Sequence, residues 1–273
     1  MPMVRVDGAL LHVRDVGGER APGAAPVVVL HGGWGYEFYP FDDAIAGIPR
    51  RFVIPDRTGY GRSPAREELP PGFHAAYAAE TLAVLDAMGI ERCVAWGHSD
   101  GAVIAALLAI RAPARCAGVI LEAVHLDRAK PRSRGFFTAM AEEPDRLGRK
   151  VGARLEADHG PAWRKVIRAG GRAWLQIAAT PDEDLYGGRL HELAVPALVL
   201  HGADDPRTEP GELDRLRREV PHAQVELIAG GQHSPHSERA TAAECTRLAR
   251  AFVERVSPWA SASPSASSAS SSP

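Results

Sequence analysis

Short apolar segments that end in glycine or in a polar turn recur along the chain, and helical patterns lie between most of them. The apolar segments are rich in Val, Ile and Leu and barely alternate, which is typical of strands covered on both faces in a parallel sheet. Strand and helix patterns that take turns in this way predict a mostly parallel, doubly wound α/β domain. The predicted strands lie within residues 26–33, 51–59, 92–97, 116–124, 195–205 and 223–231, and the predicted helices cover about residues 74–89, 101–112, 211–220 and 237–256.

Two segments depart from this rhythm. Residues 3–16 alternate apolar and polar positions, which predicts an antiparallel hairpin at one edge of the sheet. Residues 126–194 separate the sixth and seventh predicted strands and contain several helix-like stretches. Because a structureless loop of that length is uncommon in a compact domain, we expect a helical cap there. The core domain then consists of residues 1–125 and 195–256.

Composition excludes several classes of function. The chain has 273 residues, 45% of them hydrophobic and 24% charged, with a formal net charge of −2, so nothing favours a nucleic-acid partner. No apolar run is long enough to span a membrane and no signal peptide is evident, which predicts a cytoplasmic protein. Three widely spaced cysteines indicate neither a disulfide framework nor a metal site. The Ser/Ala/Pro-rich residues 257–273 predict a disordered tail.

The stretch GHSDG, residues 97–101, interrupts a predicted strand-to-helix join. Ser99 stands between Gly97 and Gly101, where a β-carbon would collide across a sharp turn. Such a turn exposes a serine hydroxyl as a nucleophile and places the N–H of Asp100 beside it, at the start of a helix. The pattern therefore predicts a nucleophile elbow with Asp100 as one oxyanion donor.

A serine nucleophile needs a histidine base, and the chain has 11 histidines. His233 follows a predicted strand and the loop glycines Gly230 and Gly231. The carboxyl ends of strands in α/β sheets are where ligand sites gather, so His233 is the predicted base. His236, in the same loop, is the alternative.

An acid must orient that histidine, and the segment ALVLHGADDP again ends a predicted strand. Asp205 is preferred and Asp204 is the alternative, in the chain order serine, acid, histidine. Glu122 ends an earlier strand and is a weaker candidate for the acid. A place for Glu122 in the pocket wall or in a salt bridge is the more ordinary interpretation.

The loop HGGWG follows the third predicted strand and suits a second oxyanion donor. The N–H of Gly33 can approach a ligand because no side chain blocks it. Trp34 is the alternative donor, and its indole is expected to wall the substrate pocket. The loop lacks the lysine and the glycine spacing of nucleotide-binding loops, so no nucleotide is expected.

Five motifs together resemble the α/β-hydrolase superfamily, over the chain up to about residue 256. The resemblance implies that Ser99 is the nucleophile, His233 the base and Asp205 the acid, since the family's acid comes third after a glycine, here Gly202. It also implies the Gly33 and Asp100 amides as the oxyanion hole, and a cap. The motifs are HGG (31–33), DRTGYGRS (56–63), GHSDG (97–101), HGADDP (201–206) and GGQHSPH (230–236).

We therefore expect a cap-bearing serine hydrolase that cleaves a small carboxylic ester through an acyl-enzyme, without metal or organic cofactor. Its partner would be a small-molecule substrate, with the protein a monomer or a homodimer. Alternatives with the same triad are a C–C bond hydrolase, a lactonase and an aminopeptidase, since HGGWG is similar to the HGGPG of proline iminopeptidases. A non-catalytic small-molecule receptor on the same fold is the alternative from another class.

Overall fold

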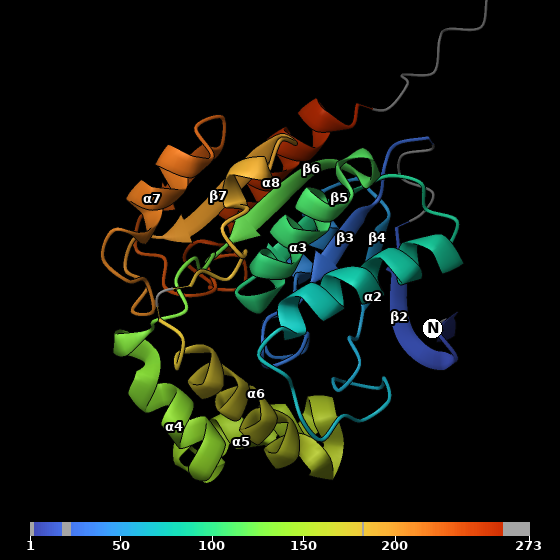
Figure 1. Cartoon of the computed structure of the whole chain (residues 1–273). Coiled ribbons are helices and arrows are strands. Elements are labelled where there is room, and N and C mark those ends of the chain that lie inside the picture. The colour runs from blue at the N-terminus through green and yellow to red at the C-terminus, as the bar shows by residue number, and fades with distance from the viewer. Residues whose placement is uncertain (1–2, 18–22, 182, 259–273) are drawn as a thin grey trace, which may run out of the picture.

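The computed structural model describes residues 3–17, 23–181 and 183–258, and its centre is an eight-stranded sheet (Figure 1). The strand order is β1-β2-β4-β3-β5-β6-β7-β8. β1 and β2 form an antiparallel hairpin, β2 pairs antiparallel with β4, and every later pairing is parallel. The strands are β1 (Met3–Val6), β2 (Ala9–Val16), β3 (Val27–Leu30), β4 (Phe52–Pro55), β5 (Cys93–His98), β6 (Cys116–Glu122), β7 (Ala197–Gly202) and β8 (Gln224–Ile228). The predicted sheet with its edge hairpin is confirmed.

The central strands are buried on both faces, which explains their near-continuous apolar sequence. In β3, all four residues are buried, and Val28 and Leu30 face one side of the sheet. Val27 and Val29 pack into a second apolar cluster on the other side. Because alternate side chains point to opposite faces, each central strand supplies both halves of the core.

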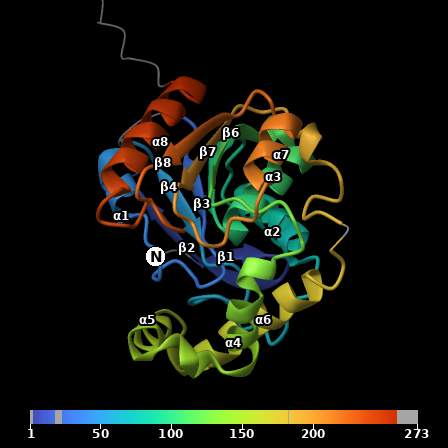
Figure 2. The ribbon, with the colours of Figure 1, turned by 90° about the vertical axis from the view of Figure 1, so that its left-hand side faces the viewer.

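Helices cover the two faces of the sheet (Figure 2). One face carries α2 (Phe73–Ala87), α3 (Asp100–Arg111) and α7 (Glu212–Glu219), and the other carries α1 (Asp42–Gly47) and α8 (Ala242–Val256). The short helix α1 has no counterpart among the predicted helices. α8 begins at Ala242, later than predicted, because the Glu238 carboxylate accepts the backbone N–H groups of Gln232 and Ser234 and holds the preceding segment in turns.

The predicted helical insertion between β6 and β7 is confirmed. It contains α4 (Arg134–Glu142), α5 (Arg149–His159) and α6 (Trp163–Ile177), which lie together below the sheet in Figure 1. In α6 the residues Trp163, Ile167, Trp174 and Ile177 are buried, at the spacing of one helix face. The residue bounds proposed for the cap stay a prediction, and most of the predicted tail lies outside the described residues.

Within residues 3–17, 23–181 and 183–258, none of the helices combines the length and the apolar composition that a membrane crossing requires. The helices are at most 15 residues long, and they either pack on the sheet or form the insertion. Their apolar faces are used in packing one layer on the next.

Candidate active site

Ser99 lies in a sharp turn between β5 and α3, with φ 56° and ψ −120°. A positive φ at a residue other than glycine is strained and costs on the order of 1–3 kcal/mol. The two flanking glycines are required by close backbone contacts. A β-carbon at Gly97 would lie 1.9 Å from the Gly101 carbonyl oxygen, and one at Gly101 would lie 1.8 Å from the Leu30 carbonyl oxygen. The sequence therefore allows a turn that lifts Ser99 above the carboxyl end of the sheet.

Three loops bring Ser99, His233 and Asp205 together. The Nε2 of His233 lies 3.1 Å from the Oγ of Ser99, and its Nδ1 lies 2.9 Å from the Oδ2 of Asp205. The tautomer that fits both contacts donates from Nδ1–H to the carboxylate and accepts the serine proton at Nε2. The other carboxylate oxygen of Asp205 accepts the backbone N–H of Arg207 at 2.9 Å. A hydroxyl, an imidazole and a carboxylate thus form one hydrogen-bonded chain.

The two alternatives from the sequence lie elsewhere. Asp204 is exposed, and among the described residues its carboxylate makes no hydrogen bond. Both ring nitrogens of His236 are occupied, because Nδ1 lies 2.6 Å from a Glu122 oxygen and Nε2–H donates to the Tyr39 carbonyl at 3.1 Å. The ring also stacks on Phe41, with 3.8 Å between the centroids. The structure brings His233 and Asp205 to Ser99, and neither alternative.

Of the two ordinary interpretations of Glu122, the salt bridge fits its contact with His236, and the place in the wall of the substrate pocket does not fit the structure. Glu122 is fully buried and accepts hydrogen bonds from the indole N–H of Trp96, at 3.1 Å, and from the backbone N–H of His236, at 3.0 Å. It is not among the residues that line the cavity beside Ser99. Strand alternation gives the reason, since Glu122 points to the same side as Ile120, which packs beneath α1 and α8.

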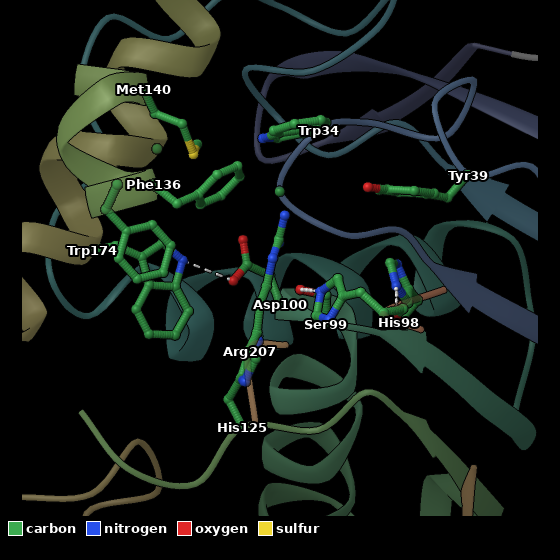
Figure 3. Close-up of a pocket in the computed structure, with 14 residues that line it drawn as sticks. Trp34, Tyr39, His98, Ser99, Asp100, His125, Phe136, Met140, Trp174 and Arg207 are labelled. Atoms are coloured by element: carbon green, nitrogen blue, oxygen red, sulfur yellow. Dashed lines mark hydrogen bonds between the residues drawn. The ribbon is translucent and has the colours of Figure 1, made fainter. Parts of the chain in front are cut away.

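A cavity of about 30 Å³ lies between the sheet edge and the cap, next to Ser99 (Figure 3). α4 and α6 supply five of its lining residues, so the insertion forms a roof over the serine. The core supplies Trp34 and the histidine of the hydrogen-bonded chain. The lining residues are Gly33, Trp34, Tyr39, His98, Ser99, Asp100, His125, Phe136, Phe137, Met140, Gly170, Trp174, Arg207 and His233.

The predicted oxyanion donors, Gly33 and Asp100, lie at this cavity. Gly33 and Asp100 both line it, and in the described part of the chain neither N–H donates a hydrogen bond to another group. The Asp100 N–H is the first of α3, a position that has no partner within a helix. Trp34 lines the same cavity, and its N–H likewise donates no hydrogen bond among the described residues, so Gly33 as the second donor stays a prediction.

The Asp100 side chain also lines the cavity, which the sequence analysis did not foresee. Its Oδ1 accepts hydrogen bonds from the Trp174 indole, at 3.1 Å, and from His74, at 3.3 Å. Burial would raise the pKa of Asp100, but these hydrogen bonds and the nearby Arg57 charge outweigh it and hold that pKa below its ordinary value. Asp100 is therefore an ionised carboxylate that accepts hydrogen bonds from one residue of α2 and one residue of the cap.

The charges around His233 suit a base at neutral pH. Burial lowers the pKa of His233, the Arg207 charge lowers it further, and Asp205 opposes both without cancelling them. The pKa of Asp205 is lowered to about 2, because the hydrogen bond and charge of His233 and the Arg207 N–H outweigh the effect of burial. At pH 7 the imidazole is neutral and the carboxylate ionised, which is the pair of states that proton abstraction from a serine requires.

The cavity residues that the sequence analysis did not name include Tyr39, His125 and Arg207. His125 comes shortly after the end of β6, and Arg207 comes two residues after Asp205. Both lie past the carboxyl end of a strand, the same position that singled out His233. That signal was present in the sequence. Where their side chains lie depends on their contacts with the cap, since Arg207 packs on Phe136 and His125 contacts Trp174.

Comparison with known proteins agrees with this architecture. The model of the "Alpha/beta hydrolase family" matches residues 27–244. The chain belongs to this family. It is a hydrolase with a sheet, a nucleophile-type turn and a helical cap insertion arranged as the fold requires.

Individual relatives match over most of the chain, among them a "Putative carbamate hydrolase RutD" of Pseudomonas savastanoi at 35% identity, over 77% of this chain and 87% of the relative. The chain is 23% identical to the serine hydrolase BPHL of Homo sapiens, over 92% of this chain and 85% of the relative. It is 25% identical to a pimeloyl-[acyl-carrier protein] methyl ester esterase of Neisseria meningitidis, over 86% of this chain and 96% of the relative. A malate-bound thermophilic esterase from Thermogutta terrifontis superposes with a TM-score of 0.70 at 20% identity, covering 93% of this chain and 98% of that one. At that identity the structural likeness shows the fold alone.

Proposed function

We propose that this hydrolase is a serine esterase that cleaves a small carboxylic ester through an acyl-enzyme on Ser99. The observation that carries the proposal is the hydrogen-bonded chain from Asp205 through His233 to Ser99, at 2.9 and 3.1 Å. A receptor has no need to keep the three groups in contact on a strained turn, because binding alone does not require a polarised hydroxyl. The names of two of the relatives, a serine hydrolase and a methyl ester esterase, support the same reaction type.

The geometry supports acylation in one sequence of proton transfers. His233 Nε2 takes the Ser99 proton as Oγ bonds to the ester carbonyl carbon, and the carbonyl electron pair moves onto its oxygen. That oxyanion accepts hydrogen bonds from the Asp100 N–H and from the N–H of Gly33. When the intermediate collapses, the bond to the leaving alkoxide breaks and the alkoxide takes the proton from His233.

Deacylation repeats the sequence with water. His233 takes a proton from a water molecule, which bonds to the acyl carbon and forms a second oxyanion. The collapse of this intermediate breaks the acyl bond to Ser99 Oγ, which takes the proton back from His233. A carboxylic acid leaves and the free enzyme returns. Asp205 holds the imidazole in one tautomer and stabilises its charged form throughout.

The enclosed volume favours a short acyl group. A cavity of about 30 Å³ holds far less than a drug-sized ligand, whose pocket has roughly 300–1,000 Å³. Phe136, Met140 and Trp174 of the cap close it. Longer acyl chains would have to displace these side chains, so we expect turnover to fall as the acyl chain lengthens.

The test is a panel of p-nitrophenyl esters of graded acyl length, run beside a lactone, a dienoate C–C substrate and a proline arylamide. We expect turnover of the short esters, with covalent labelling of Ser99 by a fluorophosphonate probe, and loss of both in Ser99→Ala. Preferred turnover of the lactone, the C–C substrate or the arylamide would move the protein to another branch of the family. A wild-type protein that neither reacts with the probe nor cleaves any of these compounds would overturn the proposal.

A further inference from the structure

The side chain of Arg207 is one of the groups that line the cavity beside Ser99. Its guanidinium lies over the ring of Phe136, at 4.1 Å from the centroid, and 5.9 Å from that of Trp34 (Figure 3). Within the described residues no carboxylate lies within ion-pair distance of this side chain. The charges of Asp205 and Asp100 act on this guanidinium through space without an ion pair, so a carboxylate that enters the cavity would give it a direct partner.

His125 is a second donor without a partner in the same wall. It is 4% exposed and stacks on His233, with 5.6 Å between ring centroids and 19° between the planes. Its Nδ1 is buried without a hydrogen-bond partner, and the described structure shows no hydrogen bond to either ring nitrogen. Buried polar side-chain atoms are nearly always paired, so an unpaired imidazole at a cavity points to a partner that arrives with a ligand.

The two carboxylates of the cavity region already have hydrogen-bond partners. Asp205 is paired with His233, and Asp100 is met by His74, Trp174 and the charge of Arg57. The guanidinium of Arg207 is therefore the charged group of the cavity that lacks a hydrogen-bonded partner among the described residues. The charge of the guanidinium also lowers the pKa values of both His125 and His233.

We propose that Arg207 and His125 form a subsite for a carboxylate of the substrate, which makes the preferred substrate an ester that carries a second, free carboxylate. This inference rests on the proposed esterase function and names its substrate class. A guanidinium can donate two parallel hydrogen bonds to a carboxylate, and the neutral imidazole can donate a third. Because both residues line the same small cavity as Ser99, the free carboxylate lies only a few bonds from the scissile carbonyl, as in the monoester of a short dicarboxylic acid.

Three matched methyl esters separate charge from shape. Monomethyl succinate carries the carboxylate, methyl 4-oxopentanoate replaces it with a neutral ketone, and methyl 3-aminopropanoate carries an ammonium group. At pH 7.5 we expect kcat/KM for monomethyl succinate to exceed that for the neutral ester by about tenfold or more, which is what one charge-assisted hydrogen bond supplies. The ammonium ester is expected to be the poorest of the three.

Substitutions assign the preference to the subsite. Arg207→Gln should bring the ratio of anionic to neutral ester close to one, Arg207→Lys should retain part of it, and His125→Phe should reduce it by a smaller factor. Arg218→Gln is the matched control, because Arg218 is exposed on α7 and away from the cavity, so the ratio should stay at the wild-type value. Removing the Arg207 charge should also move the acidic limb of the kcat/KM profile to higher pH, since that charge lowers the pKa of His233.

Binding gives a second measurement that does not depend on turnover. Succinate should protect Ser99 of the wild type from the fluorophosphonate probe, and the protection should weaken at least tenfold in Arg207→Gln. A wild type without preference for the anionic ester, or a preference and protection that survive Arg207→Gln, would overturn the subsite. If Arg207→Gln does not fold, the same comparison made with Arg207→Lys decides, and an unchanged ratio in that variant overturns the inference.

The failure of this inference is distinguishable from the failure of the proposed function. Labelling of Ser99 together with turnover of the neutral ester, without any preference for the carboxylate, leaves the esterase standing and removes the subsite. The absence of both labelling and turnover for every ester removes the proposed function, and the subsite with it.

Discussion

Two buried histidines in the loop after β8, His233 and His236, each contact a carboxylate from another segment of the chain, and only His233 reaches Ser99. In the pair of His233 and Asp205, Nδ1–H faces the carboxylate at 2.9 Å and Nε2 faces the serine at 3.1 Å. In the pair of His236 and Glu122, the second nitrogen donates to a backbone carbonyl instead. In both pairs, Nδ1 of the histidine contacts a carboxylate oxygen. They differ in what the remaining nitrogen touches, and that contact separates a candidate base from a structural pair.

Packing explains why the pairs differ. His236 stacks on Phe41, and Glu122 lies under Trp96, so this pair is enclosed by the apolar cluster beneath α1 and α8. His233 lies at the edge of the cavity below the cap, where its ring meets His125. The apolar surroundings of the pair of His236 and Glu122 keep substrate away from it, whereas an imidazole at a cavity can exchange a proton with a substrate.

The largest expected effect is on turnover, and it separates the two histidines. His233→Ala should lower kcat by about 10⁴-fold or more, because a serine without its base keeps only the contribution of binding and the oxyanion donors. His236→Gln keeps an amide donor for Glu122 and should leave kcat within a few-fold of the wild type. Steady-state kinetics on a short p-nitrophenyl ester measures both. A comparable loss in both variants would mean that the second pair takes part in the chemistry.

The next effect is on stability, and it runs in the opposite order. His236→Ala leaves the Glu122 carboxylate buried without its main partner, and breaking such a pair costs about 3–5 kcal/mol. His233→Ala opens onto a cavity where water can solvate Asp205, so its cost should be clearly smaller. Urea unfolding of the two variants measures the difference in the free energy of unfolding. Equal losses would contradict the structural assignment of the His236 pair.

The smallest effect is the dependence of stability on pH, to which the histidines around the pairs contribute. Burial is the main cause that lowers the pKa values of His31, His98 and His125 well below the ordinary 6.5. Below about pH 6.5 these histidines are therefore protonated in the unfolded chain but stay neutral in the folded chain. The free energy of unfolding then falls as pH falls. Each such histidine contributes up to about 1.4 kcal/mol per pH unit in that window. Urea unfolding at pH 8, 6 and 5 checks the sign, and stability that rises on acidification would contradict it.

Local sequence was sufficient for the elements that position the site. Near-continuous apolar runs predicted the parallel strands, and the glycines around Ser99 predicted a turn whose close contacts no other residue tolerates. Asp205 and His233 were predicted because both follow strand ends in one sheet, and such ends meet at one edge. These inferences need only backbone geometry and chain order.

Side-chain packing between distant segments was beyond that reasoning. The start of α8 depends on the Glu238 carboxylate and its contacts with the preceding loop. The side of the sheet to which Glu122 points follows from its register in β6, which the sequence does not show. Arg207 and His125 reach the cavity only because the cap lies over the sheet edge, so their part in substrate choice is visible in three dimensions alone.

Trapping of the acyl-enzyme tests the central claim most directly. Intact-mass and peptide analysis after rapid mixing with p-nitrophenyl acetate should find one acetyl group per chain, on Ser99, forming at a rate that falls at least about 10³-fold in His233→Ala and stays near the wild-type rate in His236→Gln. Acetylation at another residue, or a rate at Ser99 that is unchanged when His233 is removed, would contradict the account.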